Sequence, residues 1–229
     1  AQLHPESKYI NLTNQEGEVF GLAGLEGSGQ ELFLRTLAGL SEFHAGEIII
    51  DGDSASGISY HTRMARGIEF ISSGRLEEGL VRGLTLTEHM VLSALEKPFF
   101  IDWESITELT SQRIEQFQVI GSPTLTADAL SGGNQQRLLF AMLNAPLKVL
   151  LLDKPTRGLD VRSTSWMWDE LNKWRRDGAT ILFISEDLDE IVARSDRIGV
   201  FFGGEMIKII EAELTTEKEL GHLIGGEII

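Results

Sequence analysis

A glycine-rich loop stands between an apolar run and a helical pattern, an arrangement that could bind phosphate. Residues 18–23 are predicted to form a buried strand, and residues 31–38 carry apolar side chains at helical spacing. Between them lies Gly24-Leu25-Glu26-Gly27-Ser28-Gly29. Such glycines let backbone N–H groups converge on an anion at the positive end of the following helix. Taken alone, the loop fits a tight turn without ligand as well as it fits a phosphate cradle.

A second segment has the composition of a helix start that could grip phosphate. It reads Leu130-Ser131-Gly132-Gly133-Asn134-Gln135-Gln136-Arg137. Ser131 is expected to cap a helix that begins near Asn134 and ends before Pro146. The Ser131 hydroxyl and the amides of Gly132 and Gly133 are suited to phosphate oxygens. A simple helix cap would explain the serine and the glycines, but not the two glutamines.

Alternating strand and helix patterns must position these loops, and they favour a mostly parallel α/β sheet. Val149-Leu150-Leu151-Leu152-Asp153 is predicted to be a strand that ends in a carboxylate. An edge strand and turn are expected at 46–52, further strands at 67–72 and 179–185, and a hairpin at 198–202 and 206–210. Helices are expected at 87–92, 103–119, 163–176 and 188–192.

Length and composition limit the class of protein. A chain of 229 residues with 42% hydrophobic residues can form one domain with a sizeable core. We expect a single domain over 1–229, with an α/β core at about 1–73 and 148–229 and an inserted helical subdomain at about 74–147. No apolar run reaches the length of a membrane span, and no signal peptide is expected.

The charge and the metal-binding residue types exclude other functions. A net charge of −15 argues against binding to duplex DNA or to anionic lipid. The absence of cysteine excludes disulfides and thiolate metal sites, and the five histidines are scattered along the chain. No metal site is therefore predicted from these residue types.

The order of these segments resembles the nucleotide-binding domain of ATP-binding cassette (ABC) ATPases over nearly the whole chain. The glycine loop resembles a P-loop, Leu130–Gln136 the signature loop, Asp153 the Walker B aspartate and Asp160 the D-loop. The resemblance implies a P-loop NTPase fold with an ABC-type core, a mostly parallel sheet, a small antiparallel part and an inserted helical subdomain. It also implies ATP and Mg²⁺ as ligands, with Asp153 holding Mg²⁺ through water.

Finer features look like the sugar and nucleoside importer branch, in which one polypeptide carries two cassettes in tandem. They are Arg75–Val81, Leu130–Gln136, Pro155–Val161 and Ser185–Ile191, with Leu220–Gly226 leaning towards the nucleoside type. The second cassette of that branch commonly has a degraded P-loop and no switch histidine. This chain is similar to such a second half, and the short segment before the P-loop suggests excision from a longer protein.

Several positions depart from the pattern of an active cassette. Gln30 stands where a lysine neutralises the β- and γ-phosphates, and Glu31 where a hydroxyl ligates Mg²⁺. Lys154 replaces the catalytic glutamate, Glu186 replaces the switch histidine, and Ser73 or a neighbour replaces the Q-loop glutamine. A charged lysine cannot act as a base, although Lys154 could substitute for the missing P-loop lysine. We expect the chain's own site to hydrolyse ATP poorly.

The exchanged charges suggest an ion pair inside the site. Lys154 stands where a carboxylate belongs, while Glu31 and Glu186 stand where neutral or cationic groups belong. A pair between Lys154 and either glutamate could occupy the space of MgATP, and sequence drift without pairing is an equal alternative. Tyr9 is a candidate for stacking on adenine, but it is as readily a structural aromatic residue.

The same resemblance implies that the signature loop works on ATP held by a partner cassette. The residues that would reach that ATP are Ser131, Gly132, Gly133 and Gln135, with Asp160 touching the opposite site. The expected partners are a second cassette, in tandem or as a dimer, membrane permease subunits and, indirectly, a solute-binding protein, with no nucleic acid. By resemblance, Arg75, Glu77 and Glu78 lie near the groove for the permease, or on a solvated face.

The function expected is that of the ATP-binding component of an importer for a simple sugar or nucleoside, at the cytoplasmic face of the membrane. One alternative keeps the fold but makes the chain a non-hydrolysing regulatory or structural cassette. A less favoured alternative is a soluble ABC ATPase of DNA repair or translation. Those proteins carry coiled-coil insertions or basic linkers, which this sequence lacks.

Overall fold

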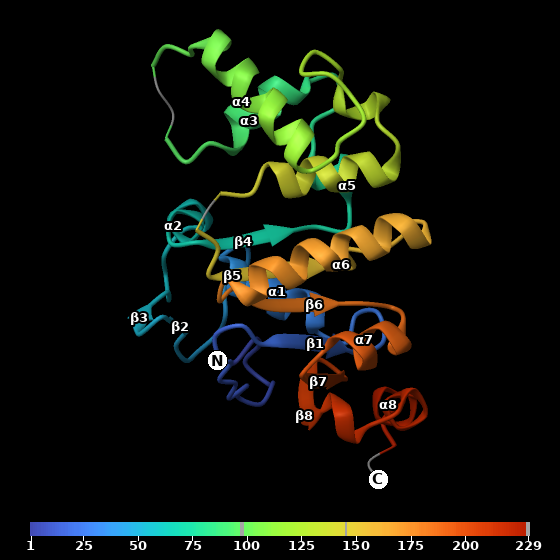
Figure 1. Ribbon diagram of the computed structural model, residues 1–229. Helices are drawn as coiled ribbons and strands as arrows, with labels where there is room; N and C mark the ends of the chain where they lie inside the picture. The colour runs from blue at the N-terminus through green and yellow to red at the C-terminus, as the bar shows by residue number, and fades with distance from the viewer. Residues whose placement is uncertain (97–98, 145, 228–229) are drawn as a thin grey trace.

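The computed structural model describes residues 1–96, 99–144 and 146–227, and a six-stranded sheet lies at its centre (Figure 1). The strand order is β4-β5-β6-β1-β7-β8. The bounds are β1 Val19–Ala23, β4 Ile68–Ile71, β5 Val149–Asp153, β6 Thr180–Ile184, β7 Arg197–Phe202 and β8 Glu205–Glu211. Every pairing is parallel except β7 with β8. The expected mostly parallel α/β sheet is therefore confirmed.

A small antiparallel pair stands apart from the main sheet. It consists of β2 (Ile49–Ile50) and β3 (Asp53–Ser54), which pair antiparallel. The edge strand and turn expected over 46–52 are present: the strand is limited to Ile49–Ile50, and Asp51 and Gly52 turn the chain with positive φ angles of 55° and 80°.

The longer helices are α1 (Gln30–Ala38), α2 (Tyr60–Ala65), α3 (Leu86–Ser93), α4 (Trp103–Gln116), α5 (Gly132–Ala141), α6 (Val161–Arg176), α7 (Leu188–Arg194) and α8 (Glu217–Ile224). Shorter turns are η1 (Arg75–Gly79, a π-helix), η2 (Ala127–Ala129) and η3 (Ala212–Leu214). The α2 and α8 helices were not expected from the sequence. The α4 helix ends before the expected residue 119, because Gln118 takes a positive φ of 54° that breaks the helix.

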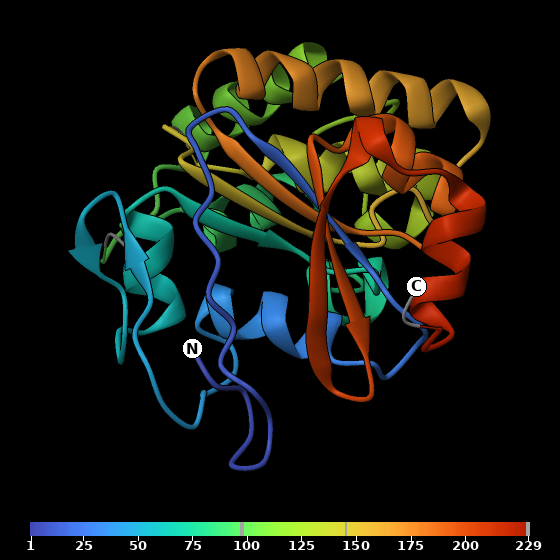
Figure 2. The same ribbon diagram turned by 90° about the horizontal axis from the view of Figure 1, so that it is seen from below.

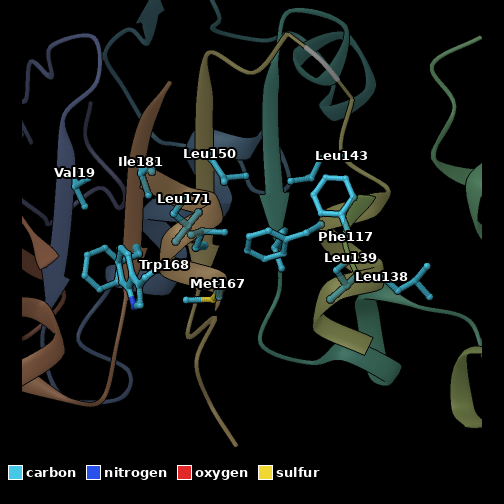
Figure 3. Packing of buried hydrophobic residues seen from close by; sticks show 14 of the residues in the cluster. Val19, Phe117, Leu138, Leu139, Leu143, Leu150, Met167, Trp168, Leu171 and Ile181 are labelled. Carbon is cyan, nitrogen blue, oxygen red and sulfur yellow. The ribbon is translucent and has the colours of Figure 1, made fainter. Parts of the chain in front are cut away.

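Alternating side chains of the strands feed two hydrophobic layers, one on each face of the sheet. On one face, Phe33 and Leu34 of α1 pack with Phe20, Leu22 and Leu151. The other face is covered by α6, and its buried Met167, Trp168 and Leu171 belong to the cluster that contains Val19, Leu150 and Ile181 (Figure 3). Figure 2 shows α1 and α6 on opposite sides of the sheet. The helix expected over 163–176 is confirmed.

Helices α3, α4 and α5 lie between β4 and β5 in the sequence and beyond the β4 end of the sheet in Figure 1. Phe117, Leu138 and Leu143 belong to the same buried cluster as Leu150, so the insert packs continuously onto the core (Figure 3). The expected limits 1–229 and 74–147 include residues 97–98, 145 and 228–229, which lie outside the described residues. No helix in the described ranges is long and apolar enough to span a bilayer.

Candidate nucleotide site and signature helix

Four neighbouring parallel strands bring the predicted site residues to one edge of the sheet. The chain leaves β1 into the glycine loop, β4 into Ser72-Ser73, β5 into Lys154 and β6 into Ser185-Glu186. Open α/β sheets bind ligands at this edge, outside the carboxyl ends of the strands. The structure thus gathers the P-loop positions and the positions after β4, β5 and β6 at the expected place.

Two glycines and a neighbouring turn set the conformation of the glycine loop. Gly27 and Gly29 adopt φ angles of 80° and 106°, which favour glycine strongly. A Cβ on Gly29 would lie 3.2 Å from the carbonyl oxygen of Gly204, in the turn between β7 and β8. The Gly204 N–H donates to the carbonyl of Ser28, a buried residue, at 3.2 Å. Close packing against this turn therefore fixes the shape of the loop.

Gln30 braces the loop from inside. Its side chain is buried, and Nε2 donates to the carbonyl oxygens of Gly24 at 3.0 Å and Leu25 at 2.9 Å. Its Oε1 has no hydrogen-bond partner within the described part of the chain. Because Oε1 is an acceptor, a phosphate oxygen could not satisfy it. The side chain at the expected lysine position thus donates its hydrogen bonds to the backbone of the loop and offers none to a phosphate.

Glu31 points along its own helix, which overturns one of the two expected ion pairs. The Glu31 carboxylate lies 3.4 Å from Arg35, and Arg35 also donates to both carboxylate oxygens of Glu78 at 2.7 Å. These hydrogen bonds raise the pKa of Arg35, that with Glu78 most. Residues four apart on a helix lie on the same face. Glu31 therefore pairs with Arg35 and not with Lys154.

The other expected pair, between Lys154 and Glu186, is present. The Nζ of Lys154 lies 2.6 Å from Oε1 of Glu186, with 13% of the lysine side chain and 63% of the glutamate side chain exposed. The hydrogen bond to Glu186 raises the pKa of Lys154, and the charges of Asp153 and Glu26 raise it further. The same bond lowers the pKa of Glu186. Lys154 follows β5 and the glycine loop follows β1, so the ion pair and the loop lie at the same edge of the sheet.

Asp153 ends β5 as a nearly fully buried carboxylate, 2% exposed. Its Oδ2 accepts a hydrogen bond from the hydroxyl of Ser73 at 2.8 Å. Its Oδ1 has no partner among the described residues. The residue expected at the Q-loop position is therefore bound directly to the predicted Walker B carboxylate, and one carboxylate oxygen is free to accept a hydrogen bond.

The Leu130–Arg137 segment forms the start of α5, but its cap differs from the expected one. Ser131 occupies the N-cap position, yet its hydroxyl makes no cap bond to the helix backbone. Instead the Asn134 side chain donates to Ser131 Oγ at 3.0 Å and accepts from the backbone of Ile120 at 2.7 Å. The α5 helix begins at Gly132, two residues earlier than predicted, so Asn134 lies within its first turn. Gln135 is buried and donates to the carbonyl of Leu130 at 3.1 Å.

Asp160 lies next to this helix start and caps α6. Its carboxylate accepts from the backbone N–H of Ser163 at 2.9 Å, and this bond contributes most to lowering the pKa of Asp160. A Cβ on Gly133 would lie 2.8 Å from Ser163 Oγ. The predicted signature and D-loop residues are therefore in close contact through Ser163.

Arg75 does not lie on a solvated face, which corrects the default expectation. The residue is only partly exposed, and its guanidinium bonds Gln136 of α5 and the backbone of Arg157. Glu77 and Glu78 are exposed, and Tyr9 is 57% exposed. Within the described ranges, no three His, Cys, Asp or Glu side chains form a group that could hold a metal ion.

Comparison with known families decides the assignment. The family model described as "ABC transporter" matches residues 7–157. The chain belongs to the ABC transporter family. The ABC fold is also found in solved structures: a dimeric ATP-binding cassette in a post-hydrolysis state bound to ADP and Pi has a TM-score of 0.75 at 23% identity, covering 93% of this chain and 94% of that one. A dimeric bacterial ABC transporter cassette has a TM-score of 0.73.

Curated relatives cover the ABC chain almost completely. A ribose import ATP-binding protein of Halalkalibacterium halodurans is 30% identical over 96% of this chain and 45% of its own length. A nucleoside import ATP-binding protein of Lactococcus lactis subsp. cremoris is 32% identical over 96% of this chain and 45% of its own length. The chain therefore spans about half the length of the relatives that it matches.

Proposed function

We propose that this chain is the ATP-binding component of an importer for a simple sugar or a nucleoside. In this proposal its own Walker site is degenerate, and its signature loop serves ATP held by a partner cassette. The names of the ribose and nucleoside import relatives support the cargo class. The observation that carries the proposal is the Lys154–Glu186 pair beside a glycine loop that lacks its own lysine.

The charges at the chain's own site fit MgATP poorly. A triphosphate needs cations at its β- and γ-phosphates, but Gln30 is neutral and Lys154 is already bound to Glu186. Glu31 adds an anion where a hydroxyl would ligate Mg²⁺. The Oδ1 of Asp153, which has no partner among the described residues, would suit a Mg²⁺-bound water. Without a base after Asp153, this site would hold the metal and the nucleotide weakly and hydrolyse ATP inefficiently.

The segments that would act on the partner's ATP keep suitable chemistry. α5 is a ten-residue helix, and the Ser131 hydroxyl and the amides of Gly132 and Gly133 stand at its start. A helix start of this kind binds phosphate through its free N–H groups and its dipole. Asp160 and Gln135 complete the set of residues that we assign to the partner's nucleotide site.

The remaining assignments follow from this function. We propose one domain with the core and helical subdomain limits given by the sequence, a peripheral position at the cytoplasmic face of the membrane, and ATP with Mg²⁺ as ligands. The partners are a second cassette, permease subunits and, indirectly, a solute-binding protein. Nucleic acid is not a partner, since the net charge is −15.

A second candidate function is a regulatory or structural cassette whose pair hydrolyses no ATP. The Lys154–Glu186 pair favours it as well, because the pair removes one cation from the site whatever the partner does. The two functions differ in turnover: an importer component supports steady ATP hydrolysis when joined to a competent cassette, and a structural cassette does not.

Titration calorimetry of the chain with MgATP tests the state of its own site. We expect no binding in the micromolar range for the wild-type chain. Micromolar binding that disappears in Gln30→Glu, which places an anion inside the loop, would contradict a degenerate site. Ser131→Ala is the matched control, because it alters the signature helix and leaves the glycine loop unchanged.

A further inference from the structure

We infer that Arg75 is a positioning residue that holds the signature helix against the segment leading to the D-loop. The inference rests on the proposed function, in which these two segments act together on the partner's ATP. It assigns to Arg75 a role inside the domain, in place of a solvated or permease-facing one.

The guanidinium of Arg75 connects two segments that are distant in the sequence. Its Nε donates to Oε1 of Gln136 in α5 at 2.9 Å, and its Nη2 donates to the carbonyl oxygen of Arg157. A Cβ on Gly132 would lie 3.3 Å from Nη1, so the group also lies against the first turn of α5. A planar guanidinium can make such bonds in two directions at once, which a lysine ammonium on one flexible stem does less well.

A direct contact joins the same two segments. Gly133 lies so close to Ser163 Oγ that a side chain at this position would clash. Ser163 in turn donates to the Asp160 carboxylate from its backbone N–H at 2.9 Å and from its hydroxyl at 3.2 Å. The signature turn therefore touches the cap of α6. Arg75 adds a second connection, because it bonds both α5 and Arg157, which lies a few residues before that cap.

The guanidinium of Arg75 bonds two neutral acceptors, a side-chain amide and a backbone carbonyl, and so connects the two segments that carry them. Among the described residues, no carboxylate forms a salt bridge with it. Burial lowers its pKa, and the nearby positive charge of Arg157 lowers it further. Two residues earlier, Ser73 bonds Asp153. The short segment 73–75 thus contacts the Walker B carboxylate at one end and the signature helix at the other.

Hydrogen–deuterium exchange of the whole chain tests the tether without a partner or nucleotide. In Arg75→Met we expect amides of 132–137 and 157–160 to exchange about tenfold faster, the effect of losing one or two hydrogen bonds. Arg82→Met is the matched control, since 65% of its side chain is exposed and it lies 4.0 Å from Glu77. Unchanged exchange in Arg75→Met would overturn the inference. If that variant fails to fold, Gln136→Met removes the bond from Arg75 to α5 and leaves the bond to Arg157. Faster exchange is then expected in 132–137, and unchanged exchange there would overturn the inference.

Turnover in the assembly with a competent partner cassette separates positioning from mere support of the fold. We expect Arg75→Met to lower kcat about tenfold or more while the KM for ATP changes less than about twofold, because the ATP lies in the partner's Walker site. Arg75→Lys should recover only part of this loss. A raised KM with unchanged kcat would overturn the positioning role. If Ser131→Ala also left kcat unchanged, the proposed function would fail, and the exchange experiment would still decide the tether.

Discussion

Removing the Lys154–Glu186 ion pair tests how strongly these two side chains stabilise the edge of the sheet at which the glycine loop lies. The perturbation is a double-mutant cycle of Lys154→Met, Glu186→Gln and the combined variant, each measured as the free energy of unfolding. The two side chains are in contact at 2.6 Å, so a cycle should detect their coupling.

The exposure of the two side chains sets the size of this coupling. Exposed ion pairs contribute about 0.2–1 kcal/mol in such cycles, and pairs that are fully buried lose about 3–5 kcal/mol when one partner is removed. Glu186 is 63% exposed and Lys154 only 13% exposed. We therefore expect a coupling of about 1 kcal/mol, at the upper end of the exposed range. In Glu186→Gln, Asp153 remains near Lys154 and compensates its charge. In Lys154→Met, water hydrates the exposed Glu186.

Urea unfolding at several pH values is the assay. The pKa of Glu186 is lowered in the folded chain, so its contribution is present above the ordinary glutamate pKa of about 4.3 and is lost as the pH falls through the lower folded value. The raised pKa of Lys154 gives the opposite limit: its contribution is lost only as the pH rises through a value above about 10.4. Zero coupling at pH 7, or a coupling that does not weaken as the pH falls below about 4.3, would refute the pair.

Three further substitutions probe other parts of the account. Arg63→Met should destabilise the chain by about 3 kcal/mol or more, measured by thermal unfolding, because buried Arg63 donates to the carbonyls of Thr36, Leu37 and Ala55 and its loss leaves them unsatisfied. Thr216→Ala should cost about 1 kcal/mol in urea unfolding, since it removes the capping box of α8; an unchanged midpoint would refute the cap. Gly133→Ala should lower the turnover of the assembly about tenfold or more, because its Cβ would displace Ser163 from the signature turn; unchanged turnover would show that this contact is dispensable.

The elements around the site were largely predictable, because each rests on a local pattern. The apolar run ending in Asp153 pairs in the sheet as expected, and the glycine loop joins a strand to a helix. The α8 helix was missed although its signal is present, a threonine followed three residues later by Glu219. The α2 helix, capped by Ser59 without such an acidic residue, gives a weaker signal.

The contacts between distant segments could be predicted only in part. The choice between Glu31 and Glu186 as partner of Lys154 was open, although Arg35 four residues after Glu31 was a local sign that Glu31 would bond along its helix. Arg75 bonds Gln136 and Arg157, which follow it by 61 and 82 positions in the sequence. No periodicity or propensity encodes such a contact, because it depends on how the insert packs onto the core.

The most direct test of the central claim compares Ser131→Ala with Asp153→Asn in the assembly formed with a competent partner cassette. Asn can still accept the Ser73 bond, so Asp153→Asn should preserve the fold. We predict that Ser131→Ala lowers kcat for ATP about 10²-fold, the effect of losing one donor to the transferred phosphate, while Asp153→Asn changes kcat less than about twofold. The reverse pattern, with turnover lost in Asp153→Asn and kept in Ser131→Ala, would show that the chain hydrolyses ATP at its own site and would contradict the account.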